Sequence, residues 1–307
     1  MVAHEFFHVI TPLNIHSEII AQFNFVEPVP SEHLWLYEGT TEWAAHIMQL
    51  RGGLIDLEGY LARLTGKLRI DDNYDPDYSL SKLALTSFEP EGNQQYANIY
   101  QRGAIVPGLL DIRLLELSNG RRGLREVINE LAKKYGPDRA FSEAGFFREF
   151  MEMTYPEIED FFERYVRKAE TLPLAEYYGK LGIYYIPEIL TGEQVPVAGF
   201  QFVAPDGRLA VANVTPDARK FGLLDGDVIV GYNGNEVTLK TARTAFAGFA
   251  QLAAGEPYEL VVDRKGEQHT LTCEKVLTER IDRHMFEVDS TATGPQITLR
   301  EAWSKNL

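Results

Sequence analysis

The chain opens with the run His4-Glu5-Phe6-Phe7-His8, and this spacing constrains the fold more than any other feature of the sequence. Two histidines four residues apart on an α-helix lie on the same face, about one turn apart. Their imidazoles can bind one tetrahedral zinc ion and leave positions for a third protein ligand and for water. Glu5 is placed to take a proton from that water. The run therefore predicts an N-terminal helix that carries two metal ligands and a general base.

A second motif, Trp35-Leu36-Tyr37-Glu38-Gly39-Thr40-Thr41-Glu42-Trp43, supplies the missing ligand type. Glu38 begins a segment in which apolar residues recur at helical spacing, so its carboxylate is expected near a helix N-terminus. With His4 and His8 it completes a His, His, Glu zinc site. Glu42 follows one turn later on the same face and is expected to accept the free N–H of a metal-binding imidazole.

The two motifs resemble the zinc peptidases whose third ligand is a glutamate, and most closely the glycyl aminopeptidase family, in which a PDZ domain follows the catalytic domain. Four further runs are also similar to that family, so the likeness extends over most of the chain; they begin at Arg51, Tyr60, Tyr100 and Phe161. The resemblance implies zinc as the cofactor, a peptide or protein as the substrate, and Glu5 as the base that activates water and then protonates the leaving amine.

The resemblance also suggests a donor for the oxyanion that forms during peptide hydrolysis. In related zinc aminopeptidases, a tyrosine in a Tyr-x-basic-Gly setting has this role, and the run Tyr100-Gln101-Arg102-Gly103 fits that pattern. The alternative is that Tyr100 is a core aromatic with its hydroxyl at the surface. The chain departs from the family after His8, where Val9-Ile10-Thr11 replaces the usual Trp-Asn pair.

The predicted fold is α+β and multidomain: the helical lobe of a thermolysin-like catalytic domain over residues 1–190, a PDZ-like β-rich domain over 191–276, and a tail over 277–307. The tail is expected to end in a short helix around Trp303 that docks on the body. The first helix of the lobe is expected to end near Pro12. Further helices are expected over residues 35–51, 54–68, 96–117, 124–135, 143–153, 156–168 and 174–181. Pro107 is expected to kink or break the helix over 96–117, and Ser142 to cap the one over 143–153.

The PDZ-like assignment is based on short apolar strands separated by turn signals and on the run Gly222-Leu223-Leu224-Asp225-Gly226-Asp227-Val228-Ile229. Lys240–Leu252 is expected to form a groove helix. Ala198, Gly199 and Phe200 would then capture the carboxylate of a C-terminal peptide beside an edge strand. Two alternatives stay open: the groove is empty or filled by the chain itself, or the chain is only a peptide-binding module with a catalytically silent helical lobe.

Composition excludes some partners. The chain of 307 residues carries 30 basic and 45 acidic side chains, a net charge of −15, which argues against nucleic acid or an anionic membrane as a partner. No run of 18 apolar residues is present, so no spanning helix is expected. The acidic stretch 71–77 lacks the glycine and the last glutamate of an EF-hand and is expected to be a solvated loop.

The remaining histidines, His16, His33, His46, His269 and His284, lack a comparable pattern and are expected to be ordinary surface or core residues. The single cysteine, Cys273, is expected in the core of a strand. Because a metal ligand at position 4 places the start of the chain inside a functional helix, we expect the chain to be a fragment with weak or no peptidase activity. The compartment, cytoplasmic or periplasmic, stays open.

Overall fold

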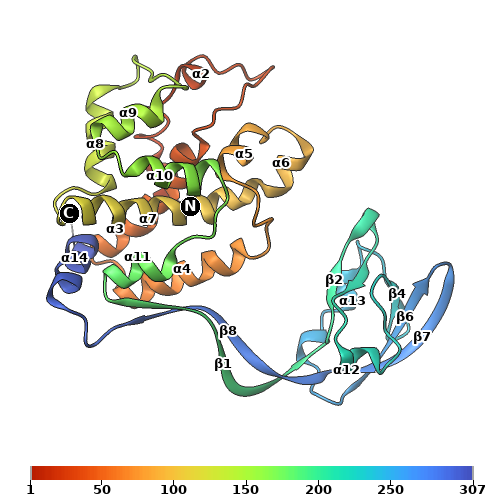
Figure 1. Ribbon diagram of the computed structural model, residues 1–307. Helices are drawn as coiled ribbons and strands as arrows, with labels where there is room; N and C mark the ends of the chain where they lie inside the picture. Colours follow the sequence, from red (N-terminus) through yellow and green to blue (C-terminus); the bar gives the residue numbers. More distant parts are fainter. Residues whose placement is uncertain (1, 306–307) are drawn as a thin grey trace. The chain divides into compact units, whose positions relative to one another are not determined.

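A computed structural model describes residues 2–305 and divides the chain into two compact units (Figure 1). The helical unit comprises Met1–Glu188 together with Arg283–Leu307, and the β unit comprises Ile189–Asp282. The buried apolar side chains form two separate clusters, one in each unit. The protein is thus a mixed α and β structure, as the sequence predicts, and its described helices include none with the length and apolar character needed to cross a lipid bilayer.

The helical unit is built from short and medium helices that surround α7 (Arg102–Leu117), whose residues are almost all buried (Figure 1). The others are α1 Val2–Phe7, α2 Glu18–Ala21, the π-helical turn η1 Trp35–Gly39, α3 Thr40–Arg51, α4 Leu57–Asp71, α5 Leu80–Leu85, α6 Pro90–Gln95, the 3-10 turn η2 Tyr96–Tyr100, α8 Leu124–Lys134, α9 Phe146–Met153, α10 Ile158–Phe162, the π-helical turn η3 Glu163–Arg167, α11 Leu174–Lys180 and α14 Gly294–Lys305.

Several boundaries match the sequence prediction. The helix expected over 35–51 is η1 followed without interruption by α3, and it ends at Gly52-Gly53, where Gly53 has a φ of 69° that glycine tolerates. Residues 124–134 and 174–180 are helical as expected. Helix α7 also ends where predicted, at Leu117, shortly before Asn119 and Gly120, which both adopt a left-handed backbone with φ of 54° and 78°.

Other expectations were wrong. The opening helix ends at Phe7, before Pro12, and continues as hydrogen-bonded turns. The helix expected over 96–117 breaks at Gln101, where ψ is −84°, and not at Pro107, which lies inside α7. Proline cannot donate to the carbonyl four residues earlier and crowds it. That carbonyl belongs to Gly103, which has no side chain of its own to add to the crowding.

Two further corrections concern polar residues. The N-cap of α9 is Gly145 and not Ser142, so α9 starts later than predicted. The acidic stretch 71–77 is not wholly solvated, because Asp71 accepts hydrogen bonds from Arg102 Nε at 3.1 Å and from Asn98 Nδ2 at 2.8 Å. Asp71 therefore joins the end of α4 to Asn98 in η2 and to Arg102, the first residue of α7.

The C-terminal helix α14 packs on α3, α7 and α11, as expected of the tail. Its Trp303 is fully buried against Tyr60 and Tyr178, with ring centroids at 5.4 Å and 6.2 Å. Arg51, at the end of α3, donates to the carbonyl oxygen of Trp303 at 2.9 Å and to Asp111 Oδ2 at 2.7 Å. The last helix of the chain is thereby tied to the helix that carries Glu42.

The β unit contains a six-stranded antiparallel sheet in the order β2-β3-β4-β6-β7, with β5 paired to β4. Its elements are β2 Gln201–Val203, the 3-10 turn η4 Pro205–Gly207, β3 Ala210–Ala212, α12 Pro216–Arg219, β4 Val228–Tyr232, β5 Asn235–Glu236, α13 Ala242–Ala245, the 3-10 turn η5 Phe249–Gln251, β6 Pro257–Arg264 and β7 Glu267–Glu274. The strands expected from the apolar alternations are therefore present, and Cys273 is buried in β7.

Two features of the β unit and its neighbouring strands differ from the sequence prediction. The helix expected over Lys240–Leu252 is reduced to α13 and η5, separated by Phe246–Gly248. Two long strands, β1 (Ile183–Val197) and β8 (Val276–Val288), precede and follow the six-stranded sheet in the sequence and pair as a two-stranded ribbon that the sequence did not predict (Figure 1).

Candidate metal centre

His4 lies in α1, and His8 lies in the first turn after that helix. The backbone stays tightly wound there, because His8 N bonds to Glu5 O and Thr11 N bonds to Phe7 O, both at 3.3 Å. The two imidazoles remain neighbours, with ring centroids 4.8 Å apart. The shorter helix therefore does not separate the predicted pair.

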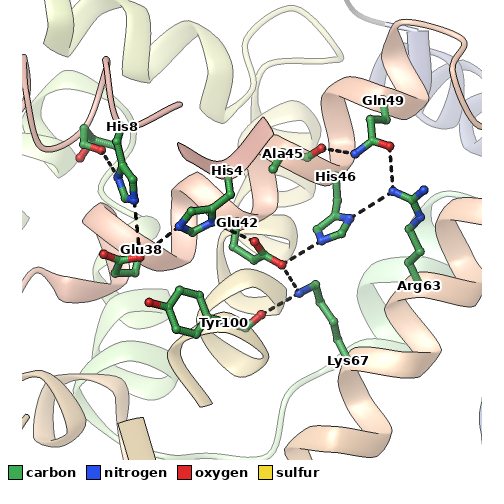
Figure 2. A network of polar contacts seen from close by, with 11 residues as sticks. His4, His8, Glu38, Glu42, Ala45, His46, Gln49, Arg63, Lys67 and Tyr100 are labelled. Atoms are coloured by element: carbon green, nitrogen blue, oxygen red, sulfur yellow. Dashed lines mark hydrogen bonds and ion pairs between the residues drawn. The ribbon is translucent and has the colours of Figure 1, made fainter. Parts of the chain in front are cut away.

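Glu38 reaches both imidazoles from η1, as Figure 2 shows. Its Oε2 lies 3.2 Å from His4 Nε2 and 3.7 Å from His8 Nε2. The three residues His4, His8 and Glu38 each offer one ligand atom, and these atoms all lie within 4.8 Å of one another. The structure thus brings together the three residues that the sequence selects as ligands, although they come from two segments of the chain.

The hydrogen bonds at the other ring nitrogens indicate the tautomer of each histidine. His4 Nδ1 faces Glu42 Oε2 at 2.9 Å, and His8 Nδ1 faces the carbonyl oxygen of Thr11, also at 2.9 Å. Because both partners are acceptors, Nδ1 carries the proton in each neutral ring and Nε2 presents a lone pair. Two lone pairs and a carboxylate oxygen then converge, an arrangement that repels itself unless a cation or a proton lies between them. The donor set therefore fits a divalent cation.

Glu42 is the best-anchored carboxylate near these ligands. Its Oε2 accepts from His4, and its Oε1 accepts from His46 Nε2 at 2.9 Å and from Lys67 Nζ at 2.6 Å (Figure 2). Burial alone raises the pKa of a carboxyl group, but the hydrogen bonds from His46 and Lys67 and their charges hold the pKa of Glu42 well below its ordinary value. Glu42 therefore stays ionised and can keep the His4 ring in one orientation.

The approach of η1 to α7 is possible because two glycines meet there. A Cβ on Gly39 would lie 2.1 Å from the carbonyl oxygen of Gly103, a distance that no side chain can occupy. Glu38 directly precedes Gly39, and Tyr100 lies three residues before Gly103. The glycine contact therefore brings the Glu38 carboxylate and the Tyr100 segment to the same place.

Tyr100, the last residue of η2, points its ring toward His4, with ring centroids 5.6 Å apart (Figure 2). Burial, and then the negative charge of Glu38, raise the pKa of the Tyr100 phenol above its ordinary value. The hydroxyl therefore keeps its proton at neutral pH and can donate a hydrogen bond. Tyr100 also packs, partly buried, against the core of the helical unit, so its ring contacts both that core and His4.

Glu5 differs from the other predicted site residues. It is exposed on α1, and within residues 2–305 its carboxylate takes part in no hydrogen bond or ion pair. Since Glu5 follows His4 in the chain, its side chain leaves from the same turn of helix as the first ligand. An exposed carboxylate without a partner is available to a water molecule or a substrate.

Two residues that contact the site were not predicted from the sequence. His46 lies four residues after Glu42 on α3, so the i,i+4 spacing of a carboxylate and an imidazole was a usable signal. His46 is not among the three residues whose ligand atoms converge, and it contacts the site through Glu42. Lys67 comes from α4, and no local spacing connects it to Glu42.

In the predicted peptide-binding loop of the β unit, Ala198-Gly199-Phe200, packing explains why the middle residue is a glycine. Gly199 has a φ of 73°, and a Cβ there would lie 2.7 Å from Thr215 Oγ1 and 2.9 Å from Ala218 Cβ. Its carbonyl oxygen accepts from Thr215 N at 2.7 Å. Ala198 and Phe200 pack at the edge of the β-unit core. Gly199 is therefore required by the contact with α12, whatever else the loop does.

Comparison with known proteins agrees with the geometry. Residues 1–106 match the family model of M61 glycyl aminopeptidase, and these residues include His4, His8, Glu38, Glu42 and Tyr100. The resemblance to this family is confirmed. A search of curated proteins gave no match.

Among solved structures, an aminopeptidase N family protein from Idiomarina loihiensis is similar over 98% of this chain, with a TM-score of 0.67 and 20% sequence identity. The chain spans 53% of the length of that protein, and the likeness concerns the fold. An HtrA-type protease with a tripeptide matches 28% of this chain and 32% of its own, at 27% identity and a TM-score of 0.24. The PDZ domain of EpsC from Vibrio cholerae matches 24% of this chain and 74% of its own, at 26% identity and a TM-score of 0.20.

Proposed function

We propose that this chain carries the metal-binding part of a zinc-dependent peptidase of the glycyl aminopeptidase family. The observation that carries the proposal is the convergence of His4, His8 and Glu38: one ligand atom of each lies within 4.8 Å of the others, and Glu38 Oε2 is 3.2 Å and 3.7 Å from the two Nε2 atoms. Two imidazoles and one carboxylate are the ligands of catalytic zinc sites that keep a position open. A zinc ion held there would polarise the peptide carbonyl and lower the pKa of a coordinated water.

Three side chains around the site supply proton transfer, oxyanion stabilisation and orientation of a ligand. Glu5 accepts the proton of the attacking water and passes it to the leaving amine, which an exposed and unpaired carboxylate can do in both directions. Tyr100 keeps its phenolic proton and donates a hydrogen bond to the oxyanion. Glu42 holds His4 in the tautomer that leaves Nε2 free. The substrate is a peptide or protein, in line with the aminopeptidase activity for which the matched family is named.

The experiment compares the wild-type chain with Glu5→Gln, both loaded with zinc. We expect both proteins to bind zinc in a chelator competition. We also expect both to bind a phosphinic peptide, whose tetrahedral anion resembles the reaction intermediate, and the chelator should abolish that binding. Slow hydrolysis of an unblocked peptide is expected only from the wild type. A wild-type chain that binds no zinc in the chelator competition would contradict the proposal. So would a Glu5→Gln protein that hydrolyses the peptide as fast as the wild type.

A second candidate function belongs to the β unit. Strand β2 is the last strand of its sheet, and its Phe202 and Val203 are 41% and 37% exposed. An extended peptide can add to such an edge, so a C-terminal peptide is the expected ligand of a PDZ-like groove. Phe202, however, packs against Phe246 with ring centroids 5.0 Å apart, which occupies part of the space beside β2. Metal-independent binding of C-terminal peptides that Phe202→Ala strengthens would support this function.

A further inference from the structure

Lys67, on α4, hydrogen-bonds to two residues beside the candidate metal centre, Glu42 and Tyr100. Its Nζ donates to Glu42 Oε1 at 2.6 Å and to the carbonyl oxygen of Tyr100 at 2.7 Å (Figure 2). Its side chain is 14% exposed. Lys67 does not face the ligand atoms of His4, His8 and Glu38, so it acts on the site only through other residues.

The contact with Glu42 has a mechanical consequence for His4. A carboxylate with one anchored oxygen can still rotate about its last bond, whereas a carboxylate anchored at both oxygens cannot. Lys67 and His46 hold Oε1, and His4 holds the other oxygen. The bond from an ammonium group is charge-assisted and is the shortest of the three, so Lys67 adds to the restraint that His46 gives the same oxygen.

The contact with Tyr100 restrains the other side of the site. Tyr100 is the last residue of η2, where backbone carbonyl groups lack partners within the helix. A lysine side chain is a suitable donor to such a carbonyl. Because the chain turns sharply at Gln101, with a ψ of −84°, the position of the Tyr100 backbone depends on contacts outside η2. Lys67 provides one of these contacts.

We propose that Lys67 is a positioning residue that couples the metal ligands to the oxyanion donor. One ammonium group fixes Glu42, and thereby the orientation of His4, and also fixes the backbone that carries Tyr100. The part of this inference that concerns Tyr100 rests on the proposed peptidase function. The part that concerns Glu42 and His4 depends only on the metal-free chain.

A similar ion pair elsewhere supplies a matched control. Lys180 on α11 donates to Glu116 at 2.8 Å, and its side chain is 22% exposed. Lys180→Met therefore removes a partly buried lysine–glutamate pair of the helical unit without touching Glu42 or Tyr100. A loss that arises only from weaker packing of the unit should appear in Lys180→Met as well as in Lys67→Met.

The experiment measures zinc affinity by chelator competition for wild type, Lys67→Met, Lys67→Arg and Lys180→Met. Changes to residues that orient metal ligands weaken metal binding by about 10–100-fold, and we expect about tenfold for Lys67→Met. Lys67→Arg keeps a charged donor and should recover part of the loss. Lys180→Met should bind as the wild type does. Equal zinc affinity of Lys67→Met and wild type would overturn the inference.

A second measurement separates this inference from the proposed function. In the zinc-free protein, long-range ¹H–¹⁵N spectra report which ring nitrogen of His4 carries the proton. We expect the wild type and Lys180→Met to show one sharp set of His4 ring nitrogen shifts and Lys67→Met to show changed or broadened shifts, because the ring is then held less firmly. If the wild type binds no zinc, the peptidase proposal fails while this result still decides the role of Lys67. Unchanged His4 shifts in a folded Lys67→Met protein would contradict that role.

Discussion

His4 contacts two carboxylates, one at each ring nitrogen, and both come from the continuous helical segment formed by η1 and α3. Glu38 and Glu42 are four residues apart, so one helical turn separates the ligand oxygen from the oxygen that orients the ring. This is why both contacts of His4 could be predicted from sequence once the segment was taken as helical. His46 extends the same face by another turn, but a lone histidine after two carboxylates gives a weaker signal than the carboxylates themselves.

Glu42→Gln is expected to weaken zinc binding by about 10–100-fold. The amide keeps the size of the side chain but turns one acceptor into a donor, which then faces either His4 Nδ1–H or the Lys67 ammonium group. Chelator competition measures the change. Glu116→Gln, which alters a carboxylate paired with Lys180, is the control and should leave zinc affinity unchanged. Wild-type affinity in Glu42→Gln would show that the tautomer of His4 does not depend on this carboxylate.

At the scale of elements, the contact between η1 and α7 determines where Glu38 lies. Sequence patterns predicted the helix over 35–51 but not its π-helical first turn, and they placed the break of the next long helix at Pro107 instead of Gln101. Both features lie beside one contact between distant segments. The carbonyl group freed by Pro107 belongs to Gly103, which meets Gly39 across the interface, and such a contact between distant segments leaves no periodic signal.

Gly39→Ala is expected to destabilise the helical unit by about 1–3 kcal/mol, because an added methyl group in a filled interface forces the backbones apart. The Cβ would lie 2.1 Å from Gly103 O. Gly66, in the middle of α4, is the control, because a methyl group added there would meet no neighbouring atom of the described residues within 4 Å. Gly66→Ala should stabilise the unit by up to about 1 kcal/mol through helix propensity. Urea unfolding measures both, and an unchanged midpoint for Gly39→Ala would contradict the close contact.

At the scale of the whole molecule, the two units have separate cores, and each has its own spectroscopic or chemical probe. Trp35, Trp43 and Trp303 all belong to the helical unit, whereas Cys273 is buried in the β unit. The two-stranded ribbon of β1 and β8 could not be predicted locally, because the whole six-stranded sheet separates its two strands in the sequence. The pairing of distant strands is a property of the folded chain.

Trp303→Ala is expected to destabilise the helical unit by about 3–5 kcal/mol, the usual cost of removing a fully buried aromatic side chain. The fluorescence of Trp35 and Trp43 reports this transition in urea.

Burial raises the pKa of the Cys273 thiol to about 11, so near pH 8 alkylation requires opening of the β unit. The rate of Cys273 alkylation should be the same in Trp303→Ala and wild type. A parallel increase would show that the two cores unfold together.

The zinc-edge X-ray absorption spectrum of the zinc-loaded chain tests the central claim most directly, because it reports the atoms bound to the metal. We expect scattering from two imidazoles and from oxygen ligands at about 2.0–2.2 Å, with one imidazole contribution lost in His8→Ala. A wild-type spectrum without imidazole scattering, or one that His8→Ala leaves unchanged, would show that His4, His8 and Glu38 do not share a metal ion.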